Sequence, residues 1–209
     1  MADMQDRLPV ANMGEQHVPV VLLVDTSASM SGEPIRELNQ GLMAFQKALQ
    51  SDLLLLNRAD VSIISFDTEV HVRMGFRPAE QYEAPTLKPG ALTSMNQGII
   101  KALDEIEDRK RLYKQQGVKY YRPWLFVLTD GLPTDDSFES EAVQRMRRAI
   151  ENKRLNYLPM GIGPDADLAQ LKKYYPASTP DKITLHATET NFASVFWWLK
   201  DIIMKLWLS

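Results

Sequence analysis

The chain has 209 residues, of which 44% are hydrophobic, and this is enough to bury the core of one large α/β domain. The 27 acidic residues outnumber the 24 basic ones, and the net charge of −3 argues against general nucleic-acid binding, which usually shows a basic excess. The chain has no cysteine, which excludes disulfides and thiolate metal sites and suits a reducing compartment.

Residues 1–17 are polar, include three acidic side chains and lack the apolar stretch of a signal peptide. We therefore expect a polar lead-in over residues 1–17, a single domain over residues 18–209, and a cytoplasmic location. The most apolar segment, residues 192–209, is interrupted by three charged side chains. We expect no membrane-spanning helix there.

Short apolar runs alternate with longer amphipathic segments along the chain. Strands are predicted over residues 18–24 and 60–66, and the alternating residues 69–74 are predicted to form the antiparallel hairpin partner of the second strand. A helix that begins at Pro34 is predicted between the first two strands. Five hydrophobic residues would share its buried face: Ile35, Leu38, Leu42, Phe45 and Leu49.

After an irregular, proline-rich segment the alternation continues to the end of the chain. Pro159 predicts a bulge or a local gap in the strand that contains it. The alternation implies a mostly parallel sheet with helices on both faces and one antiparallel edge strand. Helices are predicted from Met95 and over 142–150, 167–175 and 191–206, and strands over 124–129, 155–162 and 183–185.

Oxygen-bearing side chains follow two of the predicted strands. The first strand ends in Asp25-x-Ser27-x-Ser29, and the strand over 124–129 ends in Thr129-Asp130. In an open α/β sheet, ligands bind beyond the carboxyl ends of the strands, where the strand order reverses. If these two strands are neighbours, two carboxylates and several hydroxyls converge at one edge of the sheet.

A further hydroxyl comes from Thr93 or Ser94, which precede a predicted helix, and the spacing favours Thr93. All of these groups are hard oxygen ligands, which favour Mg²⁺, Mn²⁺ or Ca²⁺ over Zn²⁺. Neutral hydroxyls and outer carboxylates leave such an ion under-neutralised. The bound ion would therefore attract an acidic oxygen from outside the domain.

The order Asp25-x-Ser27-x-Ser29, then Thr93, then Asp130 resembles the metal-ion-dependent adhesion site of von Willebrand factor A (VWA) domains. The resemblance covers residues 18–205 and implies a doubly wound, six-stranded sheet in the order 3-2-1-4-5-6 with strand 3 antiparallel. It implies that three hydroxyls bind the metal directly and that the two carboxylates act mainly through water or hydrogen bonds. The sixth position would be left for a Glu or Asp of a partner.

Two segments, LLVDTSASMSGEPI and LTDGLPTD, are most similar to the stand-alone bacterial TerY-like group associated with tellurite resistance. Ala28 stands where glycine is usual in the family. The similarity implies a bacterial stress-response system and a signalling partner such as a protein kinase or phosphatase. Met30, Ser94 and Asp135 are candidate partner contacts on the rim of the site. In another interpretation, Asp135 and Asp136 are helix-start carboxylates that face the dipole of the following helix.

Three function classes compete at this stage. A metal-dependent binding module agrees with a hydroxyl-rich site that has no evident base or nucleophile. A phosphohydrolase with a nucleophilic Asp25 needs an acid two residues later, and Ser27 occupies that position, so we do not expect an enzyme. A nucleic-acid adaptor would use the basic residues around Arg145 and Arg147, but the acidic net charge of the chain argues against this function. The sequence does not indicate the oligomeric state.

Overall fold

The computed structural model describes residues 10–130, 132–163, 166–180, 183–187 and residue 201. The last predicted helix, over residues 191–206, lies outside the described residues except at position 201, as do most of the lead-in and Gly131. Among the described residues, no helix is both long and apolar enough to cross a membrane.

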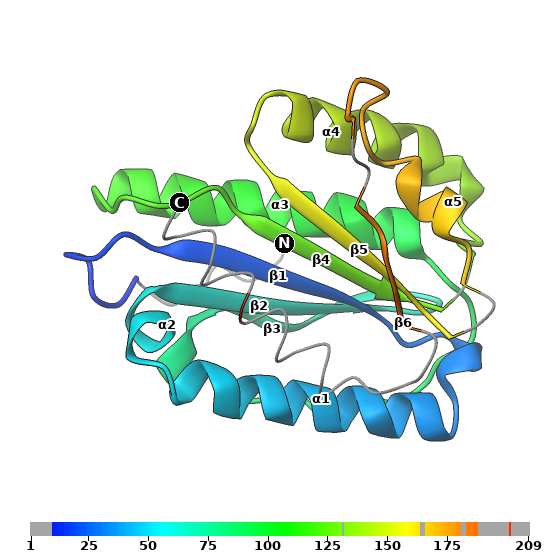
Figure 1. Cartoon of the computed structure of the whole chain (residues 1–209), viewed down its shortest axis with the longest axis horizontal. Coiled ribbons are helices and arrows are strands. Elements are labelled where there is room, and N and C mark those ends of the chain that lie inside the picture. The colour runs from blue at the N-terminus through cyan, green and yellow to red at the C-terminus, as the bar shows by residue number, and fades with distance from the viewer. Residues whose placement is uncertain (1–9, 131, 164–165, 181–182, 188–200, 202–209) are drawn as a thin grey trace.

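A six-stranded sheet in the order β3-β2-β1-β4-β5-β6 forms the centre of the molecule (Figure 1). All neighbouring strands pair in parallel except β2 and β3, which are antiparallel. The expected strand order and the antiparallel edge strand are confirmed. The strands are β1 (Val18–Asp25), β2 (Ala59–Phe66), β3 (Val70–Pro78), β4 (Trp124–Thr129), β5 (Asn156–Ile162) and β6 (Leu185–Ala187).

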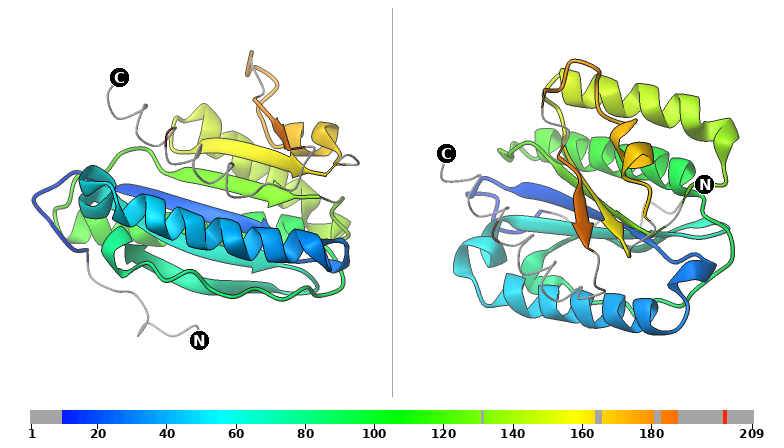
Figure 2. Two further views of the ribbon diagram at one scale, coloured as in Figure 1. Left: turned by 60° about the horizontal axis from the view of Figure 1, so that its bottom comes forward. Right: turned by 45° about the vertical axis from the view of Figure 1, so that its right-hand side comes forward.

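Helices cover both faces of this sheet, as the alternation of elements predicts (Figure 2). α1 and α2 lie on one face, and α3 and α4 lie on the other. The helices are α1 (Glu33–Gln50), α2 (Leu53–Arg58), α3 (Met95–Gln115), α4 (Glu139–Glu151) and α5 (Leu168–Lys172), with short 3₁₀ turns η2 (Ala28–Met30), η3 (Ala79–Gln81) and η4 (Asp136–Phe138).

The central strand β1 is buried on both faces, because its side chains alternate between two cores. Val20, Leu22 and Val24 pack in the core beneath α1. Val21 and Leu23 pack in the core beneath α3. A continuous apolar run is the sequence pattern that such a doubly covered strand requires, and it carries the chain directly to Asp25.

Several elements differ from the sequence-based expectation. α2 was not predicted, because its four consecutive leucines have no amphipathic period; the Asp52 side chain begins it by accepting hydrogen bonds from the backbone amides of Leu54 and Leu55. β6 lies two residues later than predicted, and α5 is shorter than the predicted helix over 167–175. The predicted bulge at Pro159 is absent. Pairing with β4 continues through this residue, and pairing with β6 begins only at Met160.

A buried polar cluster lies at the end of the sheet opposite the candidate site. Asp60, at the start of β2, is fully buried and forms an ion pair of 3.0 Å with Arg109 of α3. His17 Nδ1 lies 3.1 Å from the same carboxylate oxygen, which also accepts a hydrogen bond from the Tyr113 hydroxyl. This cluster joins the start of β1, the start of β2 and the distal part of α3.

Candidate metal centre

The candidate site lies where β1 and β4 end, at the right-hand edge of the sheet in Figure 1. These strands are direct neighbours in parallel register from Val20 opposite Trp124 to Val24 opposite Leu128. The condition for convergence, adjacency of the two strands, is therefore met. Asp25 and Asp130 follow these paired segments at the same edge.

Asp25 forms the floor of the site and is only 1% exposed. Its Oδ1 atom accepts a hydrogen bond of 2.7 Å from the backbone amide of Ser27. Its Oδ2 atom accepts one of 2.5 Å from the hydroxyl of Thr129, the last residue of β4. The carboxylate therefore fixes the turn that carries the two serines and also joins the ends of the two strands.

The two serine hydroxyls form a chain of hydrogen bonds that leads to the second carboxylate. The hydroxyl oxygens of Ser27 and Ser29 are 3.0 Å apart, and the Ser29 hydroxyl donates to Asp130 Oδ1 at 2.8 Å. Ser27 is buried, whereas Ser29 is exposed. Residues that are 101 positions apart in sequence thus meet at one polar surface, which opens to solvent at Ser29.

Backbone contacts place Thr93 between the loops that follow β1 and β4. The Thr93 amide donates to the Thr134 hydroxyl at 3.1 Å, and the Thr134 amide donates to the Thr93 carbonyl at 2.9 Å. On the other side, the Ala28 amide donates to the Ala91 carbonyl at 3.2 Å. The neighbouring hydroxyl of Ser94 donates to the Thr68 carbonyl at 3.0 Å and faces the β2–β3 turn. These contacts hold the Thr93 backbone between the two loops, and the choice of Thr93 as the third hydroxyl stays a prediction.

The two carboxyl groups are held in an environment that disfavours their negative charge. Burial raises the pKa of Asp25 to about 6, and the nearby Asp130 charge adds to this effect, against the hydrogen bonds from Thr129 and Ser27. Burial also raises the pKa of Asp130. Among the described residues, no Lys, Arg or His forms an ion pair with either carboxyl. A cation between them would relieve this cost.

The donor set fits a hard divalent ion and depends on hydroxyls. Within the described part of the chain, no three His, Asp or Glu side chains gather closely enough to form a metal site by themselves. The structure instead brings together two carboxylates, the hydroxyls of Ser27 and Ser29, and the loop that carries Thr93. Oxygen-only donors of this kind suit Mg²⁺, Mn²⁺ or Ca²⁺.

The three suggested rim residues, Met30, Ser94 and Asp135, are buried rather than exposed. Met30 is 1% exposed and packs in the core beneath α1, so it does not face a partner. Asp135 is nearly buried and caps α3, the helix that precedes it in sequence, by accepting hydrogen bonds from the amides of Asn96 (3.2 Å) and Gln97 (2.8 Å). The prediction that Asp135 faces the following helix is therefore wrong. Asp136 is exposed at the start of η4, directly before α4.

Sequence reasoning named Thr129 without giving it a role, and it missed two other residues that support the site, Thr134 and Asp67. Thr129 binds Asp25, Thr134 binds the backbone of Thr93, and Asp67 follows β2 at the same edge of the sheet. The rule that selects residues at the carboxyl ends of neighbouring strands, which pointed to Thr129, would also have found Asp67. No local pattern marks Thr134.

The doubly wound sheet, with hydroxyls and carboxylates at the ends of its central strands, defines a Rossmann-like α/β domain with a candidate metal centre. The von Willebrand factor type A domain model matches residues 20–202, and the chain belongs to this family. Domains of this family often mediate metal-dependent protein binding. No curated protein matches the chain significantly.

Solved structures with the same fold come from several different organisms. The ArnB paralog VWA2 of Sulfolobus acidocaldarius has a TM-score of 0.62 at 19% identity, over 88% of this chain and 45% of that one. The vWF domain of the Porphyromonas gingivalis pilus tip protein Mfa5 has a TM-score of 0.63 at 12% identity, over 90% and 95%. Manganese-loaded Plasmodium vivax TRAP protein has a TM-score of 0.60 at 17% identity, over 87% and 72%. This chain thus spans less than half of the Sulfolobus protein.

Proposed function

We propose that this chain is a binding module that holds one divalent ion, Mg²⁺, Mn²⁺ or Ca²⁺, and uses it to capture an acidic side chain of a protein partner. The observation that carries the proposal is the hydrogen-bonded chain from Ser27 through Ser29 to Asp130, beside the buried carboxyl of Asp25. The manganese-loaded TRAP structure, which has the same fold, supports the choice of a divalent ion.

In this proposal the three hydroxyls of Ser27, Ser29 and Thr93 bind the ion directly. Asp25 and Asp130 orient these ligands and act through water or hydrogen bonds. The bound ion supplies positive charge at a surface that is open at Ser29. Because the direct ligands are neutral, much of that charge is left for an incoming carboxylate, and this favours Glu or Asp on the partner.

A phosphohydrolase is less consistent with the same geometry. Both carboxylate oxygens of Asp25 accept hydrogen bonds, from the Ser27 amide and the Thr129 hydroxyl, so neither is directed at an external substrate. The position two residues later, where such an enzyme needs an acid, is Ser27, whose hydroxyl lies against Ser29. We therefore propose binding without catalysis.

A nucleic-acid adaptor is also less consistent, because the basic face of α4 is largely engaged within the chain. Arg145 pairs with Asp104 at 2.5 Å and with Glu141 at 3.4 Å. The Arg147 guanidinium donates to the backbone carbonyls of Lys173 and Tyr175. These contacts hold the guanidinium groups away from a phosphate backbone.

The TerY-like sequence similarity extends the proposal to its biological setting. We propose a cytoplasmic role in a bacterial stress-response or tellurite-resistance system, with a protein kinase or phosphatase as the partner. The support for this setting is the sequence similarity alone.

The test is capture of partner proteins from an extract of the source cells on the immobilised chain. We expect proteins to be retained in Mg²⁺ and lost in EDTA, and lost again with Asp25→Ala or Ser27→Ala. Ser31→Ala is a matched control, because Ser31 is exposed two residues beyond the proposed ligands, and it should retain the same proteins. Retention of the same proteins in EDTA and by both site variants would contradict the proposal.

A further inference from the structure

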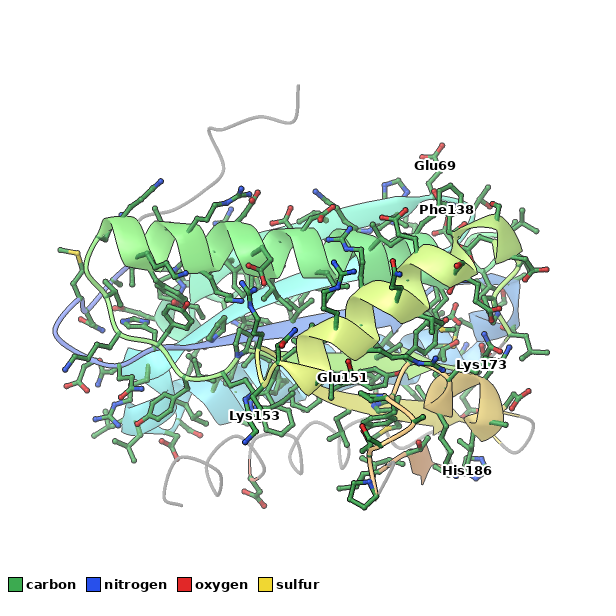
Figure 3. The ribbon with its side chains drawn as sticks, turned by 90° about the horizontal axis from the view of Figure 1, so that it is seen from above. Glu69, Phe138, Glu151, Lys153, Lys173 and His186 are labelled. Atoms are coloured by element: carbon green, nitrogen blue, oxygen red, sulfur yellow. The ribbon has the colours of Figure 1, made fainter. Side chains whose placement is uncertain are left out.

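A third carboxylate, Asp67, lies at the same edge of the sheet, directly after β2. Both of its oxygens are engaged inside the protein. Oδ2 accepts a hydrogen bond of 3.0 Å from the Thr26 hydroxyl, and Oδ1 accepts one of 3.3 Å from the Glu69 amide. In Figure 3 the Glu69 side chain lies at the outer edge of the molecule. Because both oxygens of Asp67 accept hydrogen bonds within the protein, this residue holds loops together, and we do not assign it as a metal ligand.

Three separate segments of the chain meet at Asp67. The Gly90 amide donates to the Thr26 carbonyl at 2.6 Å, so the loop before α3 is bound to the loop after β1. The Ser94 amide donates to the Asp67 carbonyl at 2.8 Å, so the same loop is also bound to the turn after β2. Thr26 itself is fully buried, and its amide donates to the Phe66 carbonyl at 2.9 Å.

Gly90 is needed for this close approach. A Cβ atom at position 90 would lie 2.4 Å from Asp67 Cγ and 2.6 Å from Asp67 Cβ, far inside van der Waals contact. Any larger residue at this position would push the Asp67 side chain away from Thr26. We call the arrangement of Thr26, Asp67 and Gly90 the Asp67 clamp.

The Asp67 clamp acts on residues adjacent to the proposed ligands. Thr26 stands between Asp25 and Ser27, and Ser94, whose amide binds Asp67, follows Thr93 directly. Fixing these two neighbours fixes the separation between the serine turn and the third hydroxyl. In the site proposed above, that separation would set the space left for the ion.

We propose that the Asp67 clamp makes the site selective for Mg²⁺ over Ca²⁺, and this inference rests on the metal-binding function proposed above. Mg²⁺ demands near-ideal octahedral geometry with short bonds, whereas Ca²⁺ accepts longer bonds and irregular coordination. A loosened clamp should therefore weaken Mg²⁺ binding far more than Ca²⁺ binding. Groups that orient metal ligands in this way commonly change metal affinity by about 10- to 100-fold.

The test is titration calorimetry of Mg²⁺ and of Ca²⁺ on the full chain, with folding checked by circular dichroism. Thr26→Val removes the hydroxyl but keeps the side-chain shape, and Thr26→Ser is its matched control because it keeps the hydroxyl. Gly90→Ala displaces Asp67 by an independent route. Gly14→Ala is its control, because a Cβ there meets no atom within 4 Å.

We expect the ratio of the Ca²⁺ and Mg²⁺ dissociation constants to fall about tenfold in Thr26→Val and Gly90→Ala and to stay unchanged in both controls. If wild type binds metal but the ratio is the same in every folded variant, or if both ions weaken equally, the selectivity inference is wrong and the metal site stands. If wild type binds neither ion, the inference fails, and the proposed function fails with it if Mn²⁺ does not bind either. Gly90→Ala decides the question if Thr26→Val does not fold.

Discussion

At the residue scale, the central feature is Asp25, a buried carboxyl that the fold holds between two hydrogen-bond donors. Sequence alone indicates this residue, because an apolar strand that ends in Asp-x-Ser-x-Ser marks the carboxyl end of a buried strand. Its partner Thr129 is 104 positions away, and only the pairing of β1 with β4 brings it near.

Asp25 should destabilise the metal-free protein at neutral pH. Its folded-state pKa of about 6 lies above its ordinary value of 3.8, so the folded state binds the proton more tightly than the unfolded state. The resulting stability is fully present below about pH 4 and is lost as the pH rises through about 6. We compare the free energy of unfolding of Asp25→Asn with that of wild type in EDTA. Between pH 4 and pH 8 this difference should shift in favour of the variant by up to roughly 3 kcal/mol.

Urea unfolding at the two pH values measures this difference in the free energy of unfolding. The same variant should lose any stabilisation by Mg²⁺, because the orienting charge is gone. A difference between the two proteins that does not change with pH would show that the carboxyl titrates normally, contrary to the account.

Thr93 and Ser94 should behave differently, although they are adjacent hydroxyl residues. The Ser94 hydroxyl donates to the Thr68 carbonyl, whereas the backbone of Thr93 is held between the two ligand loops. We expect Thr93→Ala to weaken Mg²⁺ binding about tenfold or more and Ser94→Ala to leave it nearly unchanged. Calorimetric titration of both variants checks this, and the reverse order would assign the third ligand to Ser94.

At the scale of elements, α3 connects the two ends of the sheet. It begins two residues after Thr93, and its distal part carries Arg109 and Tyr113 to the buried Asp60. Sequence predicted the helix from its amphipathic period, but it assigned Asp135 to the wrong helix. A carboxylate in a loop between two helices can cap either one, and only the tertiary structure decides.

Asp135 should matter for stability through the start of α3. Asp135→Ala removes hydrogen bonds to the Asn96 and Gln97 amides, and we expect a loss of about 1–2 kcal/mol in the free energy of unfolding. Asp136→Ala is the matched control and should cost much less, because that side chain is exposed. Denaturant unfolding compares the two, and equal losses would contradict the assignment of the cap.

The buried cluster should produce a second pH dependence. Burial alone would lower the pKa of His17, but the hydrogen bond and charge of Asp60 outweigh it and raise the pKa above 6.5. The stability that His17 contributes is therefore fully present below pH 6.5 and is lost as the pH rises through the raised value. The pH range in which His17 loses its stabilising effect therefore lies above the range in which Asp25 does.

His17→Gln tests this contribution of the cluster. The difference in the free energy of unfolding between wild type and the variant should shrink as the pH rises from 6 to 9, because neutral His17 no longer interacts as a cation with Asp60. Urea unfolding over this range measures the difference. A difference that stays constant would show that His17 does not titrate there. No local sequence pattern marks His17, since its partners come from β2 and α3.

At the scale of the whole molecule, the fold explains why widely separated motifs form one site. Periodicity predicted the strands, most helices and the antiparallel edge, because both cores require alternating or continuous apolar residues. The strand order came from the family resemblance, and the sheet confirms it. The contact of Thr134 was not predictable, because it depends on how loops meet across the sheet. The contacts of Asp60 were not predictable either, because they depend on how α3 packs against the start of β2.

The most direct test of the central claim is the number and affinity of Mn²⁺ ions bound by the full chain, measured by electron paramagnetic resonance. The account predicts one ion per chain for wild type and for Ser31→Ala, and binding at least about tenfold weaker for Ser27→Ala combined with Ser29→Ala. Absence of binding by wild type, or equal affinity in the double variant, would contradict it.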